Sequence, residues 1–231
     1  MGYYYYDFSY FIFMLPCLIL SLYCSFKVNS TFKKYSKVRN TRGITGAQAA
    51  HQVLMANGVT GVTIEHVSGN LTDHFDPRTN TIRLSDSVYN SNSVAAVGVA
   101  AHEAGHAVQH AQNYLPNKIR SAVVPVANIG SRLSWLFIFI GLLLPVQFNF
   151  VVTLGIVFFS FSVIFTLITL PVEFDASKRA LATIEQANLL GVDEYKGAKK
   201  TLSAAAMTYV AAAATAVAQL LRLILVLNRR R

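Results

Sequence analysis

Long apolar segments alternate with polar ones along this chain of 231 residues. Phe8–Phe26, Ala122–Leu144 and Val151–Leu170 are each close to the ~20 residues that a helical membrane span requires. The alanine-rich segment Thr201–Leu227 is also long enough to cross a bilayer. The pattern therefore predicts three or four transmembrane helices, with Tyr3–Tyr6 as aromatic residues at the membrane interface.

The segment between the first two apolar runs has the periodicities of a small α+β region. Thr45 is a good N-cap for a short helix, and Asn92 or Ser93 is one for a longer helix. Between them, alternating apolar positions predict a strand and then a hairpin. The expected elements are a helix, three strands and a second helix, over Gly46–Asn57, Val62–Val67, Leu71–Phe75, Thr81–Ser85 and Val94–Gln112.

Composition agrees with a membrane protein. Hydrophobic residues make up 53% of the chain and charged residues 13%, against about 25% charged in a typical soluble domain. The mean hydropathy is +0.41. The two cysteines, Cys17 and Cys24, lie seven apart in the first apolar run, so a disulfide framework is excluded.

The net charge of +9 gives an orientation rather than a nucleic-acid partner. Six basic residues follow the first apolar run directly: Lys27, Lys33, Lys34, Lys37, Arg39 and Arg42. By the positive-inside rule this side is cytoplasmic and the N-terminus lies outside. A fourth span would place Arg229–Arg231 outside, against that rule. Thr201–Leu227 is therefore either a fourth span or a helix that packs along the site.

The longer helix carries the residues of a zinc hydrolase. His102 and His106 lie four apart, so one helical face directs both imidazoles at one metal ion. Glu103 lies beside that face and can reach a water on the metal. This H-E-x-x-H spacing is typical of zinc peptidases, in which the glutamate is the general base.

A catalytic zinc site needs a third protein ligand. The metzincin pattern requires glycine at 109 and histidine at 112, where this chain has Gln109 and Gln112. His110 is two turns from His102, too far to share its metal, so we expect it to be a polar or supporting residue.

A downstream carboxylate is the remaining ligand type. Five acidic residues follow residue 110, and they are Glu173, Asp175, Glu185, Asp193 and Glu194. Glu173 is favoured because it directly follows an apolar run, where an ionisable group is unfavourable unless it is paired or bound to metal. The last three lie among ordinary surface residues. The two crossings between Ala122 and Leu170 return Glu173 to the side of the histidines.

Three motifs together resemble a known family. They are LTDHFDPR over Leu71–Arg78, VGVAAHEAGHAVQH over Val97–His110 and LPVEFDAS over Leu170–Ser177. They are similar to those of the YugP-like membrane zinc metallopeptidases, over nearly the whole chain. The resemblance implies a zinc endopeptidase of a prokaryotic plasma membrane.

A more distant similarity links the chain to HtpX and the CAAX-prenyl proteases. In that group a glutamate begins an E-x-x-x-D motif, and here position 177 is serine while the nearest acid is Asp175. The resemblance therefore makes Asp175 and Ser177 the candidates for orienting a zinc histidine.

These observations predict a mainly α membrane protein with a small zincin-like α+β insertion on the cytoplasmic side. We expect an N-terminal transmembrane helix, a cytoplasmic region with the H-E-x-x-H helix, a transmembrane hairpin, and a segment with the third ligand and an apolar helix. Their boundaries are 1–26, 27–121, 122–170 and 171–231.

The predicted activity is hydrolysis of peptide bonds, in a peptide or membrane-protein substrate, with Zn²⁺ as cofactor and Glu103 as general base. His74 and Tyr209 are the candidate donors to the tetrahedral oxyanion. Two alternatives remain: a non-catalytic scaffold that kept a zinc site, and a zinc-dependent lipid hydrolase. The intact Glu103 argues against the scaffold, because a structural site needs no base.

Overall fold

The computed structural model describes residues 8–230, and the chain divides into two compact units. The helical unit contains the chain up to Tyr23, Ile119–Leu170 and the chain from Tyr209 onward. The mixed unit contains Cys24–Lys118 and Pro171–Thr208. The predicted interfacial tyrosines, Tyr3–Tyr6, lie outside the described residues.

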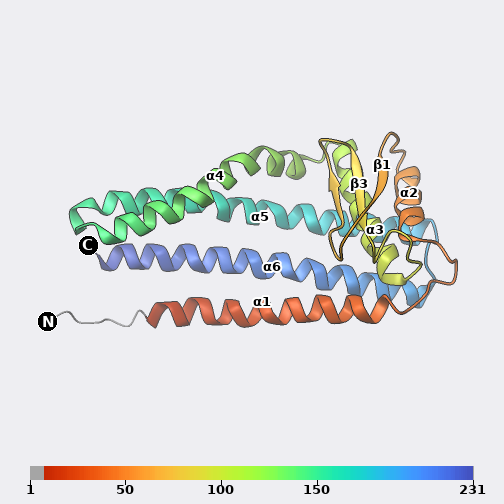
Figure 1. Cartoon of the computed structure of the whole chain (residues 1–231), viewed down its shortest axis with the longest axis horizontal. Helices are drawn as coiled ribbons and strands as arrows, with labels where there is room; N and C mark the ends of the chain where they lie inside the picture. Colours follow the sequence, from red (N-terminus) through yellow and green to blue (C-terminus); the bar gives the residue numbers. More distant parts are fainter. Residues whose placement is uncertain (1–7, 231) are drawn as a thin grey trace. The chain divides into compact units, whose positions relative to one another are not determined.

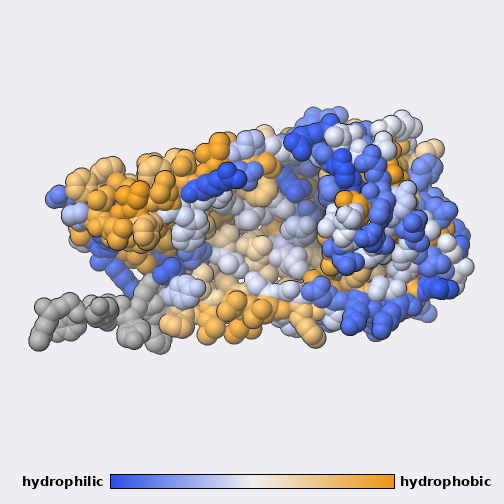
Figure 2. All heavy atoms as spheres, viewed as in Figure 1, coloured by the Kyte–Doolittle hydropathy of each residue, from blue (hydrophilic) through white to orange (hydrophobic). Residues whose placement is uncertain are grey.

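Four helices among the described residues are long and apolar enough to cross a membrane. They are α1 (Phe8–Tyr35), α4 (Leu115–Leu143), α5 (Asn149–Gln186) and α6 (Val192–Arg229) (Figure 1). Many of their large apolar side chains face outward, among them Leu143 and Phe150, and Figure 2 shows this apolar surface. Apolar surface of this extent is typical of contact with lipid. All four predicted segments are thus candidate spans.

In the helical unit, α4 and α5 form the predicted hairpin. The 3₁₀ turn η1 (Val146–Phe148) connects them. A Cβ atom on Gly155 would lie 2.8 Å from the backbone nitrogen of Ile138, and one on Gly141 would lie 2.7 Å from that of Val152. These small residues therefore allow the two helices to approach closely, as in many membrane helix pairs.

The end of α6 belongs to the same unit. The guanidinium of Arg230 donates to the carbonyl oxygens of Gly141 at 2.8 Å and Leu144 at 2.9 Å, beside the hairpin turn. Leu223 and Leu227 are buried in a cluster with apolar residues of α4 and α5. The first half of α6 belongs to the mixed unit instead. Helix α6 is thus a candidate fourth span, and its first half lies in the unit that contains the histidines.

The sheet of the mixed unit has three strands in the order β1-β3-β2. The central strand β3 (Thr81–Ser85) pairs in parallel with β1 (Thr63–Val67) and antiparallel with β2 (His74–Asp76). Ile82 and Leu84 of β3 are fully buried. The predicted strand and hairpin are confirmed, with shorter first and second strands.

Both predicted helices of this region are present with the expected caps. Thr45 forms a capping box with Gln48 at the start of α2 (Gly46–Ala56). The apolar face of α2 is buried in the core, against α3 (Val94–Ala111) and the sheet. Ser93 caps α3 by accepting a hydrogen bond from the backbone N–H of Ala96.

Four helix boundaries differ clearly from the prediction. Helix α1 ends at Tyr35 rather than Phe26. Helix α4 begins at Leu115 rather than Ala122, with Pro116 in the first turn, where its missing N–H is tolerated. Helix α5 continues through Pro171, because Val172 and Ala176 are fully buried and tertiary packing compensates for the lost hydrogen bond. Helix α6 begins at Val192, so the loop predicted over Asn188–Lys196 is shorter.

Two glycines of α3 provide a matched test of this packing. A Cβ on Gly105 would lie 2.6 Å from the carbonyl oxygen of Ala176, whereas one on Gly98 would lie 3.4 Å from the Cβ of Ala198. Gly105→Ala should therefore destabilise the protein by about 1–3 kcal/mol, because backbone must shift. Gly98→Ala should be neutral or stabilising by up to about 1 kcal/mol, since alanine favours the helix. Thermal unfolding in detergent measures both, and equal melting temperatures would contradict the close α3–α5 contact.

Candidate metal centre

The helix α3 presents two histidines to one point in the mixed unit. His102 and His106 are one turn apart, and their ring centroids are 4.7 Å apart with the rings nearly perpendicular. Both side chains are largely buried. Small residues surround them on the helix, so neighbouring segments can approach the rings closely.

The third residue comes from α5, as the sequence predicted. The Glu173 Oε2 atom lies 3.3 Å from Nε2 of His102 and 3.5 Å from Nε2 of His106. Glu173 is 3% exposed. One candidate ligand atom from each residue lies within 4.8 Å of the other two. The structure thus brings together all three predicted ligands.

These separations fit a zinc ion. In a tetrahedral site with bonds of about 2.0–2.1 Å, the ligand atoms stand about 3.3–3.4 Å from one another. The two histidine–carboxylate distances agree with that spacing. Two imidazoles and one carboxylate are the donor set of many catalytic zinc sites, in which the fourth position is left for water or substrate.

The electrostatics of the group favour a cation. Burial lowers the pKa of His106, but the adjacent carboxylate of Glu173 and the negative charge of Glu103 outweigh burial, so the net effect raises that pKa. Glu103 is itself 8% exposed. Two buried carboxylates thus act on the same imidazole, and a dication bound there would balance their charge.

The Nδ1 atom of each histidine contacts a polar side chain. Nδ1 of His102 lies 3.1 Å from the hydroxyl oxygen of Ser177. Nδ1 of His106 lies 3.1 Å from Oε1 of Gln109, whose Nε2 donates to Asp175 Oδ2 at 2.8 Å. Ser177 therefore contacts a histidine directly, while Asp175 reaches the other one through Gln109.

Gln109 is the supporting residue that the sequence reasoning missed. The sequence suggested only that a glutamine at this position rules out the metzincin pattern. A usable signal was present, because residue 109 lies three positions after His106 and so on the same helical face. Its partner on α5 is 66 residues away along the chain and could not be assigned from spacing.

Two other histidines that the sequence singled out lie outside the ligand group. The ring of His110 packs on that of Phe75, with the centroids 5.7 Å apart. His74 is exposed on β2, and its Nδ1 lies 2.8 Å from the carbonyl oxygen of Thr72. Tyr209 belongs to the helical unit, so its proposed role stays a prediction.

The later acidic residues have roles outside this group. Glu194 accepts hydrogen bonds from the backbone N–H groups of Thr41 and Gly191. Asp193 pairs with Lys196 at the surface, and Glu185 is exposed. None of the three belongs to the cluster of candidate ligands among the described residues.

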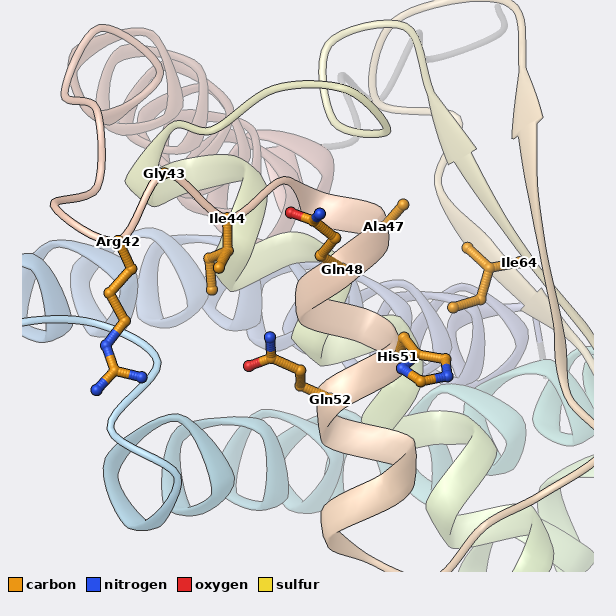
Figure 3. Close-up of a pocket in the computed structure, with 8 residues that line it drawn as sticks. All are labelled: Arg42, Gly43, Ile44, Ala47, Gln48, His51, Gln52 and Ile64. Atoms are coloured by element: carbon orange, nitrogen blue, oxygen red, sulfur yellow. The ribbon is translucent and has the colours of Figure 1, made fainter.

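A separate surface hollow of about 560 Å³ lies between the Arg42 loop, α2 and β1 (Figure 3). It shares no residue with the metal group. Polar and apolar residues line it about equally, and the polar ones are Arg42, Gln48, His51 and Gln52. With one histidine and no acidic residue in its lining, it does not offer a second metal-binding set.

Comparison with known proteins supports a zinc peptidase. The sequence model of a family described as "Putative neutral zinc metallopeptidase" matches residues 10–228. Over 222 residues the chain is 46% identical to the "Putative membrane protease YugP" of Bacillus subtilis (strain 168). That alignment covers 95% of this chain and 98% of the relative. No solved structure matches the chain.

The ligand assignment predicts the zinc content of two variants. Glu173→Ala should weaken zinc binding by about 10–100-fold or more, since the loss of a mere supporting residue reaches that range. Glu185→Ala, an exposed glutamate later in the same helix, should keep its zinc. Zinc per protein after mild chelation measures both. Full retention in Glu173→Ala, or loss in Glu185→Ala, would contradict the assignment.

Proposed function

Since the chain belongs to the neutral zinc metallopeptidase family, we propose that it is a membrane-embedded zinc endopeptidase with His102, His106 and Glu173 as metal ligands. The observation that carries this proposal is the convergence of His102 Nε2, His106 Nε2 and Glu173 Oε2 in a buried position. The name of the relative, a membrane protease, supports the same activity.

The chemistry divides between the ion and the chain. Zinc, when bound, supplies Lewis acidity that activates water and polarises the scissile carbonyl. His102, His106 and Glu173 would hold the ion. Glu103 takes the proton of the attacking water and then passes it to the leaving amine. Glu103 is largely removed from bulk water, and its charge acts on the His106 imidazole.

Two residues are the candidate donors to the oxyanion, His74 and Tyr209. Because the Thr72 carbonyl only accepts hydrogen bonds, the 2.8 Å contact places a proton on Nδ1 of His74. Nε2 of His74 then donates only when the imidazole is cationic. Tyr209 carries a hydroxyl donor at neutral pH and is the other candidate.

The sheet offers a way to hold an extended peptide. In the order β1-β3-β2, strand β2 has one pairing edge not used by the described strands. The contact of Phe75 with His110 places β2 next to the helix of the candidate ligands. A peptide substrate that adds to this edge would be bound by main-chain hydrogen bonds, largely independent of its sequence.

The buried base favours an enzyme over a scaffold. A structural zinc site has no use for Glu103, and a buried carboxylate without a function is unfavourable. The choice of peptide over lipid as substrate rests on the family. Location in a prokaryotic plasma membrane rests on the bacterial relative and the four apolar helices. The cytoplasmic side of the site rests on the basic residues at the end of α1 and directly after it.

Exchange of the base separates metal binding from catalysis. Glu103→Gln should keep its zinc, because the ligands are unchanged, and should lose activity by about 100- to 10,000-fold. Cleavage of casein by detergent-purified protein, alongside zinc content, tests this. A proteomic comparison of membranes that carry the parent or the variant would then identify substrates. Turnover near that of the parent would remove Glu103 from the mechanism.

The orientation can be tested with single cysteines in a protein without Cys17 and Cys24. Arg78→Cys, at an exposed position of the mixed unit, should react with an impermeant thiol reagent only after the cells are permeabilised. Val146→Cys, in the exposed turn between α4 and α5, should react in intact cells. The reverse pattern would place the candidate metal centre outside the cytoplasm.

A further inference from the structure

A buried glutamine connects one candidate ligand, His106, to the helix α5, which carries Glu173. Gln109 is 0% exposed, and its amide contacts three groups. Oε1 lies 3.1 Å from Nδ1 of His106, and Nε2 lies 2.8 Å from both the carbonyl oxygen of Val172 and Oδ2 of Asp175. A polar group is buried at little penalty only when such partners are present.

The partners on α5 determine which way the amide points. A backbone carbonyl and a carboxylate only accept hydrogen bonds, so the amide nitrogen of Gln109 must face Val172 and Asp175. The amide oxygen must then face His106. An amide oxygen cannot donate, so this contact is a hydrogen bond only when the proton of His106 lies on Nδ1.

We propose that Gln109 is a positioning residue that holds His106 as the Nδ1–H tautomer and so leaves Nε2 as the metal-binding atom. This inference rests on the proposed zinc site. A metal ligand must offer an unprotonated nitrogen. The opposite tautomer would place the lone pair of His106 Nδ1 against the amide oxygen of Gln109. It would also place a proton on His106 Nε2, the atom that lies 3.5 Å from Glu173 Oε2.

The carboxylate of Asp175 is itself held. Its Oδ2 accepts from Nε of Arg179, which compensates the negative charge. The Arg179 guanidinium also donates to Oε1 of Gln112 on the far side of the network and lies over the ring of Tyr114, 5.5 Å from its centroid. Arg179, Asp175 and Gln109 therefore form a continuous chain of hydrogen bonds that ends at His106.

The described contact of His102 Nδ1 does not fix the tautomer of that histidine. The Ser177 hydroxyl, 3.1 Å from its Nδ1, can donate or accept, so this contact is compatible with either tautomer. Of the two candidate histidine ligands, His106 is therefore the one whose tautomer is fixed, through Gln109 and Asp175, by groups that can act in one hydrogen-bonding sense.

The test uses four variants and three measurements. Gln109→Met removes the amide at similar volume, and Gln112→Met is the control, since it makes the same change on the same network without touching a histidine. Gln109→Glu places acceptors against Asp175 and Val172. The double variant Gln109→Glu/Asp175→Asn exchanges amide and carboxylate, so a donor again faces residue 109 and the net charge is that of the parent.

Zinc affinity by competition with a chelator, the absorption spectrum of the Co²⁺-loaded protein, and the melting temperature of the metal-free protein are measured for each. Gln109→Met should bind zinc about 10–100-fold more weakly, with a changed Co²⁺ spectrum, as expected for loss of an outer hydrogen bond to a ligand. Gln112→Met should keep the affinity and spectrum of the parent. Gln109→Glu should lose affinity, and the double variant should regain part of it.

The outcomes separate this inference from the proposed function. Parent-like affinity and spectrum in Gln109→Met, with zinc lost in Glu173→Ala, would overturn the positioning role and leave the metal centre intact. Failure of the parent to bind zinc would overturn both. If Gln109→Met does not fold, the double variant Gln109→Glu/Asp175→Asn is compared with Gln109→Glu instead. A zinc affinity of the double variant no higher than that of Gln109→Glu would also overturn the positioning role.

Discussion

The close approach of α3 and α5 is the constraint on which the candidate centre depends. Gly105 leaves room for the backbone at Ala176, and no side chain could occupy that space without moving one helix. The two histidines are on one side of this contact and Glu173 is on the other. A displacement of about 1 Å would exceed the tolerance of zinc–ligand distances. The glycine next to His106 is therefore as necessary to the site as the ligands.

Helix α5 contains both a candidate membrane span and the proposed third ligand, Glu173. The apolar window of α5 has the highest mean hydropathy of the four candidate spans, 2.5. Its polar continuation after Pro171 supplies Glu173, Asp175, Ser177 and Arg179. A continuous helix thus carries the candidate span and, directly after it, the proposed third ligand.

Local patterns in the sequence were enough for most of the fold. The caps at Thr45 and Ser93, the alternation of the strands and the apolar runs each depend on neighbours a few residues away, and each was found. The pair His102 and His106 is local in the same sense. Glu173 could be predicted although it is distant in sequence, because the predicted transmembrane hairpin returns the chain to the same side and few acidic residues follow it. Its place beside both histidines agrees with that reasoning.

What the sequence did not reveal depends on contacts between distant segments. The continuity of α5 through Pro171 follows from burial of Val172 and Ala176, which no local propensity of proline would suggest. The role of Gln109 depends on acceptors 63 and 66 residues away. Asp175 was a candidate through family resemblance, but the residue between it and His106 was not. Supporting hydrogen bonds of this kind become visible only when both helices are in place.

X-ray absorption at the zinc edge of the purified protein tests the central claim most directly. The account predicts one zinc ion with nitrogen and oxygen ligands at about 2.0–2.2 Å, and scattering from two imidazoles. Glu173→Ala protein loaded with zinc should lose the carboxylate and keep both imidazoles. A sulfur ligand at about 2.3 Å, or a third imidazole, would contradict the centre of His102, His106 and Glu173.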